Sequence, residues 1–200
     1  NMSSKIVLAS RSPSRIELLE SAGIVFSSRS HMINEDKEKQ NILSNKKNPK
    51  EFVREIAIKK AVSISHKLEN DLVIGSDQIL YFNGIVFSKP RSRQELIEQI
   101  SLFQGQDHKL YSSACALKGN KLMWSYTSSA VMSMRYLSPS YIERYVRSNW
   151  SEVKNSVGGY HIERQGIKLF SSIKGDYFTV RGIPLMELIN FLISTKTINL

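Results

Sequence analysis

The sequence contains a single cysteine, Cys115, and only four histidines among its 200 residues. One thiol cannot form an internal disulfide, and because Cys115 lies in an apolar, strand-like segment we expect it to be buried and unreactive. The histidines are His31, His66, His108 and His161. They show neither i, i+4 spacing nor a neighbouring Cys-x-x-Cys pair, so the sequence does not indicate a zinc site.

Long apolar runs are also missing, because no segment approaches the roughly 20 residues that span a bilayer. The sequence has no charged start followed by an apolar core and a small-residue cleavage site, so we expect a cytoplasmic protein without a membrane partner. Gly-x-Ser-x-Gly, Walker and Gly-x-Gly-x-x-Gly segments are absent. These absences argue against a serine hydrolase elbow, a P-loop and a dinucleotide-binding turn.

Negative charge is scarce, since 28 Lys and Arg residues face 18 Asp and Glu residues, which leaves a net charge of +10. Such an excess suits either a nucleic acid backbone or a small polyanion such as a triphosphate. The basic residues are scattered along the chain and form no stripe interleaved with aromatic residues. Composition alone leaves both partner classes open.

The stretch from Asp71 to Pro90 organises the chain. A short run of apolar residues with branched side chains predicts a buried strand that ends at Gly75, and the carboxylate of Asp77 lies just beyond it. A second run then meets Asn83-Gly84, which favours a type I′ hairpin turn, and the returning strand stops at Lys89-Pro90. Asp77 and Lys89 are either surface residues or an acid and a base brought to one cleft.

A strand over residues 5–9 precedes the polar loop 10–15 and a helix that ends at Gly23. Hydroxyl groups and arginines ahead of a helix N-terminus make a plausible phosphate cradle. Ser12 as N-cap with Pro13 at the first helical position also explains the loop as ordinary capping. The two interpretations are compatible.

Residues 27–49 predict a loop with at most a short helical turn, and the remaining pattern alternates helices with strands. We expect helices from Pro49, after Ser92, from Pro139 and over 186–193, and strands near 109–117, 121–126, 131–134 and up to 173. The sequence therefore predicts a mixed α/β fold. We expect a twisted, partly antiparallel sheet flanked by helices, as one domain over residues 1–200 with two lobes around a central cleft.

Six segments occur in the order and approximate spacing of one family: residues 9–15, 60–61, 74–77, 89–90, 158–160 and 175–184. In these segments the sequence resembles the Maf family of nucleoside triphosphate pyrophosphatases, once named for septum formation. The resemblance extends from about Ile6 to Leu192. It implies cleavage between the α and β phosphates with a divalent cation, Mg²⁺ or Mn²⁺, and it implies a nucleoside triphosphate partner and a homodimer.

Matching residue by residue, the resemblance implies that Asp77 is the catalytic base toward water, and that it also helps to hold the metal with Glu35. Ser12 and Arg15 match the phosphate-binding loop, and Lys60 and Lys89 match lysines that face the triphosphate. Such cations would stabilise charge that develops on the leaving pyrophosphate.

Three positions bear on base specificity. Ser14 stands where the family commonly has an arginine, and where the branch acting on 7-methyl-GTP has a tryptophan. Gln78 and Glu163 resemble that same branch, in which a carboxylate accepts hydrogen bonds from a guanine edge.

Asn34 replaces the usual aspartate before Glu35, with Asp36 as a substitute metal ligand.

Two other functions fit parts of the sequence. The net charge and the altered loop suit a regulatory module linked to cell division that binds nucleotide or nucleic acid without hydrolysis. Release of single phosphates would differ only in the anhydride attacked. The resemblance favours the pyrophosphatase, and we do not expect nucleic acid as a partner.

Overall fold

The structure is a computed structural model that describes residues 4–43 and 48–200. Its first half comprises β1 (Ile6–Leu8), α1 (Pro13–Ser21), β2 (Ser27–Ser28), α2 (Glu35–Leu43), α3 (Pro49–Ser65), β3 (Leu72–Phe82), β4 (Ile85–Phe87) and α4 (Arg93–Phe103). The second half comprises β5 (Asp107–Lys118), β6 (Lys121–Met134), α5 (Pro139–Val153), η1 (Val157–Gly159), η2 (Gln165–Leu169), β7 (Phe170–Lys174), α6 (Tyr177–Arg181) and α7 (Leu185–Ser194). None of the helices in these ranges is both long enough and apolar enough to cross a membrane.

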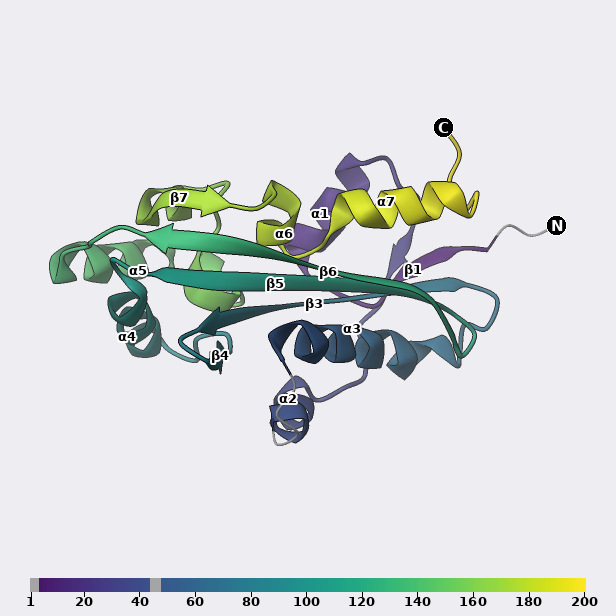
Figure 1. The fold of residues 1–200 in the computed structure, drawn as a ribbon, viewed down its shortest axis with the longest axis horizontal. Coiled ribbons are helices and arrows are strands. Elements are labelled where there is room, and N and C mark those ends of the chain that lie inside the picture. The colour runs from purple at the N-terminus through teal and green to yellow at the C-terminus, as the bar shows by residue number, and fades with distance from the viewer. Residues whose placement is uncertain (1–3, 44–47) are drawn as a thin grey trace. The chain divides into compact units, whose positions relative to one another are not determined.

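The strands form one seven-stranded mixed sheet with the order β2-β1-β3-β5-β6-β7, and β4 pairs with β3 (Figure 1). β1 runs parallel to both β2 and β3, whereas the β3–β4 and β6–β7 pairs are antiparallel. Helices flank this open sheet. The mixed α/β fold predicted from the sequence is confirmed.

The chain divides into two compact units, and the long strands β3, β5 and β6 contribute residues to both. The first unit contains Asn1–Gln78, Ser112–Ser128 and Arg181–Leu200, and the second contains Ile79–Tyr111 and Ser129–Val180. A single domain over residues 1–200 and a cleft between two lobes stay predictions.

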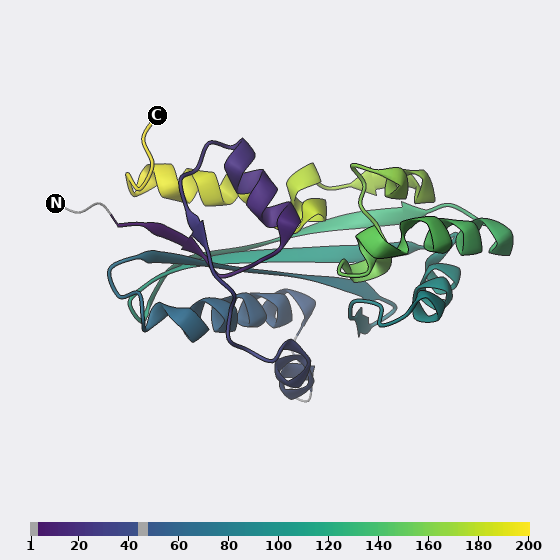
Figure 2. The same ribbon diagram turned by 180° about the vertical axis from the view of Figure 1, so that it is seen from behind.

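In the first unit, α3 covers one face of the strands, and α1 and α7 cover the other (Figures 1 and 2). Ala57 and Ala61 of α3 pack against Val73 of β3 in an apolar cluster that also contains the buried Cys115. Burial raises the pKa of that thiol to about 12, so it stays protonated at neutral pH. The expectation of a buried, unreactive cysteine agrees with this placement.

Gly75 lets β3 pass close to α3. A Cβ at this position would meet the carbonyl oxygen of Ala57 and lie 2.9 Å from the Cβ of Ala61, so only glycine fits without backbone movement. The prediction that the strand ends at Gly75 is wrong, because β3 continues through Asp77 to Phe82. The glycine marks a close approach of a helix, and Asp77 therefore lies inside a strand.

The second unit is built around a large apolar cluster to which α4, α5 and the adjoining strands contribute. Its β3–β4 hairpin turns at Asn83 and Gly84, whose φ angles of 49° and 81° agree with the predicted type I′ turn. Ser92 caps α4 by accepting a hydrogen bond from the Glu95 backbone N–H at 3.0 Å, as the capping-box spacing predicts.

Helix α2 was not expected, because the sequence predicted a loop with at most a short turn over residues 27–49. Its start is explained by Asn34, whose Oδ1 accepts a hydrogen bond from the Lys37 backbone N–H at 3.1 Å. The first turn carries Glu35, Asp36 and Glu38, which the helix dipole stabilises. Capping and charge at the N-terminus thus form a helix that lacks a regular apolar face.

The buried imidazole of His108 makes the stability of the fold dependent on pH. Its Nε2 lies 2.8 Å from the Tyr160 hydroxyl, and burial lowers its pKa from 6.5 to about 4. Between those values the unfolded chain binds more protons than the folded chain, so the free energy of unfolding falls as the pH is lowered. We expect this group to remove about 3 kcal/mol between pH 7 and pH 4.

Urea unfolding at a series of pH values measures this contribution. His108→Gln is the matched variant, because an amide can pair with Tyr160 but does not titrate. The difference between the two chains isolates His108 from the other histidines. Equal pH slopes for both chains would show that His108 does not carry the effect.

Candidate active site

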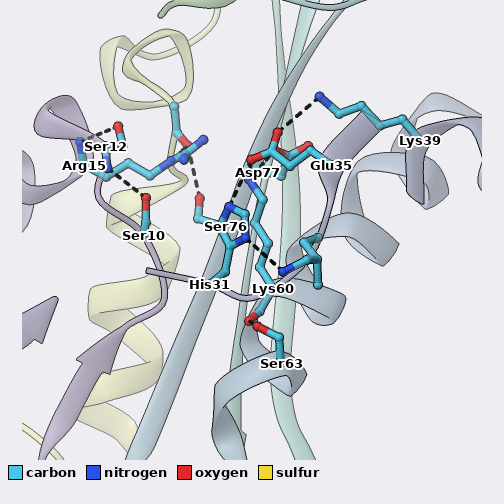
Figure 3. Close-up of polar contacts among 12 residues, drawn as sticks. Ser10, Ser12, Arg15, His31, Glu35, Lys39, Lys60, Ser63, Ser76 and Asp77 are labelled. Carbon is cyan, nitrogen blue, oxygen red and sulfur yellow. Dashed lines mark hydrogen bonds and ion pairs between the residues drawn. The ribbon is translucent and has the colours of Figure 1, made fainter. Parts of the chain in front are cut away.

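Asp77 and Lys60 form a buried ion pair in the first unit. The carboxylate lies on β3 and is 3% exposed, whereas the ammonium lies on α3 in a residue that is 4% exposed. Lys60 Nζ donates to Asp77 Oδ1 at 2.8 Å (Figure 3). The close packing of β3 against α3 at Gly75 brings the two side chains together. Burying two charges is costly even when they are paired, because both lose their hydration. A fold that keeps such a pair buried therefore marks a candidate site for chemistry.

Glu35 completes the cluster from the first turn of α2. Its Oε1 lies 3.0 Å from Lys60 Nζ and 3.1 Å from His31 Nε2, and its Oε2 lies 3.6 Å from Lys39 Nζ. One ammonium, that of Lys60, is therefore shared by two carboxylates. The hydrogen bond from His31, aided by the charges of Lys60 and Lys39 and opposed by burial, holds the pKa of Glu35 well below its usual range. Glu35 stays ionised at neutral pH.

The loop between β1 and α1 lies in the same unit and is held by its own hydroxyl groups. Ser12 caps α1 by accepting from the Arg15 backbone N–H at 3.4 Å, and the Ser12 N–H donates to Ser10 Oγ at 3.1 Å. Ser28 of β2 donates to the Ser10 carbonyl oxygen at 2.6 Å. The capping predicted for Ser12 and Pro13 is confirmed, and the loop at this helix N-terminus is hydrogen-bonded on both sides of Ser12.

Arg15 is buried behind this loop, at 9% exposure. Its Nε donates to the Gly182 carbonyl oxygen at 2.8 Å, and Ser76 Oγ donates to the same oxygen at 3.2 Å. Burial lowers the pKa of Arg15, while the charges of Asp77 and Glu35 oppose that shift. The guanidinium therefore lies in the electrostatic field of the two carboxylates, and the segment at Gly182 ties α1 to β3.

Comparison with known proteins places the chain in a family. The model of the Maf-like protein family matches residues 5–195, almost the whole chain. The chain belongs to the Maf family. The resemblance read from six short segments is thereby confirmed.

Curated relatives of this Maf chain carry two kinds of name. A nucleoside triphosphate pyrophosphatase from Ruegeria pomeroyi is 37% identical over 191 residues, which cover 96% of each chain. A 7-methyl-GTP pyrophosphatase from Brucella suis is also 37% identical, over 99% of this chain and 100% of the relative. A solved dITP/XTP pyrophosphatase from Mycobacterium abscessus aligns with 74% of this chain and 96% of its own at 12% identity, with a TM-score of 0.41.

The carboxylates of Asp77 and Glu35 offer oxygen ligands of the kind that Mg²⁺ binds. Within the described residues, Asp77 Oδ2 is buried and has no hydrogen-bond partner, so one carboxylate oxygen is available. No group of three or more His, Cys, Asp or Glu side chains that could by itself hold a metal ion is found in residues 4–43 and 48–200. Mg²⁺ is commonly held by one or two carboxylates, with phosphate and water oxygens completing its shell. Asp77 and Glu35 fit that mode, whereas Asp36 is exposed.

Two of the three specificity positions lie in the first unit with the cluster. Ser14 donates through Oγ to the Arg181 carbonyl oxygen at 2.9 Å and accepts from Arg181 Nε at 3.0 Å. A guanidinium thus lies against the position where the family commonly has arginine. Gln78, next to Asp77, donates through Nε2 to Ser112 Oγ at 3.3 Å.

Lys89 and Glu163 belong to the second unit. Lys89 is exposed in the loop after β4, and Glu163 lies in a turn where its Oε1 is 3.7 Å from His161 Nδ1. Their roles toward the triphosphate and the base stay predictions. The structure brings together Ser12, Arg15, Glu35, Lys60 and Asp77 within one unit.

Sequence reasoning did not select His31, Lys39 or Arg181. The first two come from the segment interpreted as a loop, although the i, i+4 spacing of Lys39 from Glu35 on a capped helix was a usable signal. Arg181 joins Ser14 across 167 positions of sequence, a contact that no local pattern reveals. Long-range pairing of this kind needs the fold.

Proposed function

We propose that this Maf chain hydrolyses nucleoside triphosphates between the α and β phosphates, giving a monophosphate and pyrophosphate. The observation that carries the proposal is the cluster in which the buried Asp77 and Lys60 meet the partly exposed Glu35, in the same unit as the capped Ser12 loop. Relatives that match almost the whole chain are named as pyrophosphatases, which supports the same reaction.

In this proposal Asp77 is the base. Lys60 holds Oδ1, and Oδ2 has no partner in the described residues, so Oδ2 is the atom that accepts a proton from water. The water oxygen forms a bond to the α phosphorus while the bond from that phosphorus to the bridging oxygen breaks. The bridging oxygen leaves with its electron pair as part of pyrophosphate. Lys60 and Arg15 offset the developing negative charge, and Lys89 is proposed to act with them.

We propose Mg²⁺ or Mn²⁺ as the cofactor, held by Asp77 and Glu35. The unpartnered Oδ2 of Asp77 and the ionised Glu35 support this assignment. The bound ion would neutralise triphosphate charge. Asp77 is thus proposed for two roles, and because a carboxylate oxygen has two lone pairs, Oδ2 would bind the ion with one and accept the proton with the other.

For the nucleobase of the substrate we propose a preference for 7-methyl-GTP over dTTP and UTP, with Ser14, Gln78 and Glu163 setting the selectivity. The Brucella suis relative named for 7-methyl-GTP matches end to end, and Gln78 resembles the same branch. Without a tryptophan at Ser14, we expect no stacking on the methylated base from that position.

A substrate panel tests the function and the preference together. Purified protein is incubated with Mg²⁺ or Mn²⁺ and GTP, 7-methyl-GTP, dTTP, UTP or CTP, and products are separated by ion-exchange chromatography. We expect monophosphate and pyrophosphate, fastest from 7-methyl-GTP, and no product in excess chelator. Faster turnover of dTTP or UTP would contradict the proposed preference for 7-methyl-GTP. Full activity in excess chelator would contradict the proposed dependence on a divalent cation.

We also propose a cytoplasmic location, and from the family resemblance we propose a homodimer. Size-exclusion chromatography with light scattering tests the second, with a mass near twice the 22.8 kDa of one chain as the expected result.

A further inference from the structure

His31 contacts the carboxylate cluster, and nothing in the proposed reaction uses it. Its Nε2 lies 3.1 Å from Glu35 Oε1, the same oxygen that faces Lys60 Nζ (Figure 3). The side chain is 22% exposed, so the imidazole lies at the edge of the cluster. Its position suggests a role in setting the geometry of Glu35.

The direction of the hydrogen bond follows from the other ring nitrogen. The backbone N–H of Ile33 donates to His31 Nδ1 at 3.4 Å, so Nδ1 acts as an acceptor. In a neutral imidazole with Nδ1 as acceptor, the proton is on Nε2. Nε2–H therefore donates to Glu35 Oε1. The backbone of the same segment fixes both the tautomer and the orientation of the ring.

The segment that carries His31 is anchored to the helix that carries Lys60. The backbone N–H of Met32 donates to Ser63 Oγ at 3.0 Å, and Ser63 Oγ donates to the Lys60 carbonyl oxygen at 2.7 Å. Figure 3 shows Ser63 on α3 with His31, Glu35 and Lys60 above it. Because His31 and Lys60 share this anchor, the two donors to Glu35 Oε1 keep a fixed relation.

We propose that His31 is a positioning residue that orients the Glu35 carboxylate for a divalent cation. A carboxylate at the start of a short surface helix has rotational freedom, and two fixed donors on Oε1 remove it before any ion arrives. Outer-sphere donors of this kind tune ligand orientation and metal affinity. The inference rests on the proposed function, because it assumes that Glu35 is a metal ligand.

Two substitutions separate the donor from the rest of the side chain. Asparagine places its amide near the position of Nδ1, where it can still accept from Ile33, but it falls short of Glu35. Glutamine carries its amide N–H to the position of Nε2. The probe is Mn²⁺ added to the protein without nucleotide, and the loss of the free-ion EPR signal gives the dissociation constant. We expect about tenfold weaker binding for His31→Asn and a change under about twofold for His31→Gln.

His66→Asn is the matched control, because His66 is an exposed residue at the C-terminal end of α3, and its Mn²⁺ affinity should equal that of the wild type. Thermal unfolding of every variant confirms that the fold is intact, and the KM for nucleotide at saturating metal should stay near the wild-type value.

Equal Mn²⁺ affinity for His31→Asn and wild type would overturn the inference while the proposed function stands. An equal loss of Mn²⁺ affinity in His31→Asn and His31→Gln would overturn the inference as well, since the donated N–H would then not be the cause of the tighter binding in the wild type. If the wild type neither binds Mn²⁺ nor releases pyrophosphate, the proposed function fails first and the inference fails with it.

Discussion

Asp77→Asn should lower the rate of pyrophosphate release by about a thousandfold, within the range that a general base contributes. The amide has the shape of the carboxylate, so it can still accept the hydrogen bond from Lys60, but it cannot take a proton from water. Lys60 also keeps Glu35 at 3.0 Å, so the buried ammonium does not lose its last partner. We therefore expect the free energy of unfolding to change by no more than about 1 kcal/mol.

Asp71→Asn is the matched control for this variant. Asp71 lies just before β3 and is only partly buried, so the same chemical change at that position should leave turnover unaffected. Rates are measured by coupled pyrophosphate detection, and stability is measured by urea unfolding. Retention of more than a tenth of wild-type activity in Asp77→Asn would remove Asp77 from the role of base.

Lys60→Met is expected to have the largest effect on stability. Methionine fills a similar volume, but it leaves Asp77 buried opposite Glu35 without the ammonium that they share. Removing one partner of a buried ion pair costs about 3–5 kcal/mol, because a desolvated charge is left uncompensated. Turnover should fall as well, since the cation proposed to offset developing charge on pyrophosphate is lost.

Lys59→Met provides a comparison at the adjacent position. The ammonium of Lys59 lies 2.5 Å from Glu38 Oε2 but its side chain is 38% exposed, so its loss should cost under about 1 kcal/mol. In a second comparison, adding Asp77→Asn to Lys60→Met should recover part of the lost stability by removing the uncompensated charge. The account of the cluster would be wrong if Lys59→Met and Lys60→Met unfolded at the same urea concentration.

Much of the fold could be predicted because its signals are local. N-caps followed by proline at Ser12, Asn48 and Ser138 mark the starts of α1, α3 and α5, and Asn83-Gly84 marks the hairpin turn. The error at Gly75 has a physical cause, since a glycine needed for close helix packing looks the same in sequence as a glycine that ends a strand. Helix α2 was missed because capping and charge form it in place of an apolar face.

The candidate site could be predicted only in part, and the signals differ from those of the fold. Asp77, Lys60 and Glu35 were selected from the family resemblance, while their spacing alone left surface roles open. Lys60 and Lys59 are adjacent and chemically identical in the sequence, and only the packing of α3 on β3 buries one and exposes the other. The hydrogen bonds of His31 and the contact between Arg181 and Ser14 depend on geometry that periodicity does not encode.

Hydrolysis of 7-methyl-GTP in water enriched in ¹⁸O tests the central claim most directly, with the products separated and weighed by mass spectrometry. The account predicts one heavy oxygen in the monophosphate, none in the pyrophosphate, and loss of both products in Asp77→Asn. Heavy oxygen in the pyrophosphate, release of single phosphates, or nucleotide binding without any hydrolysis across the substrate panel would contradict it.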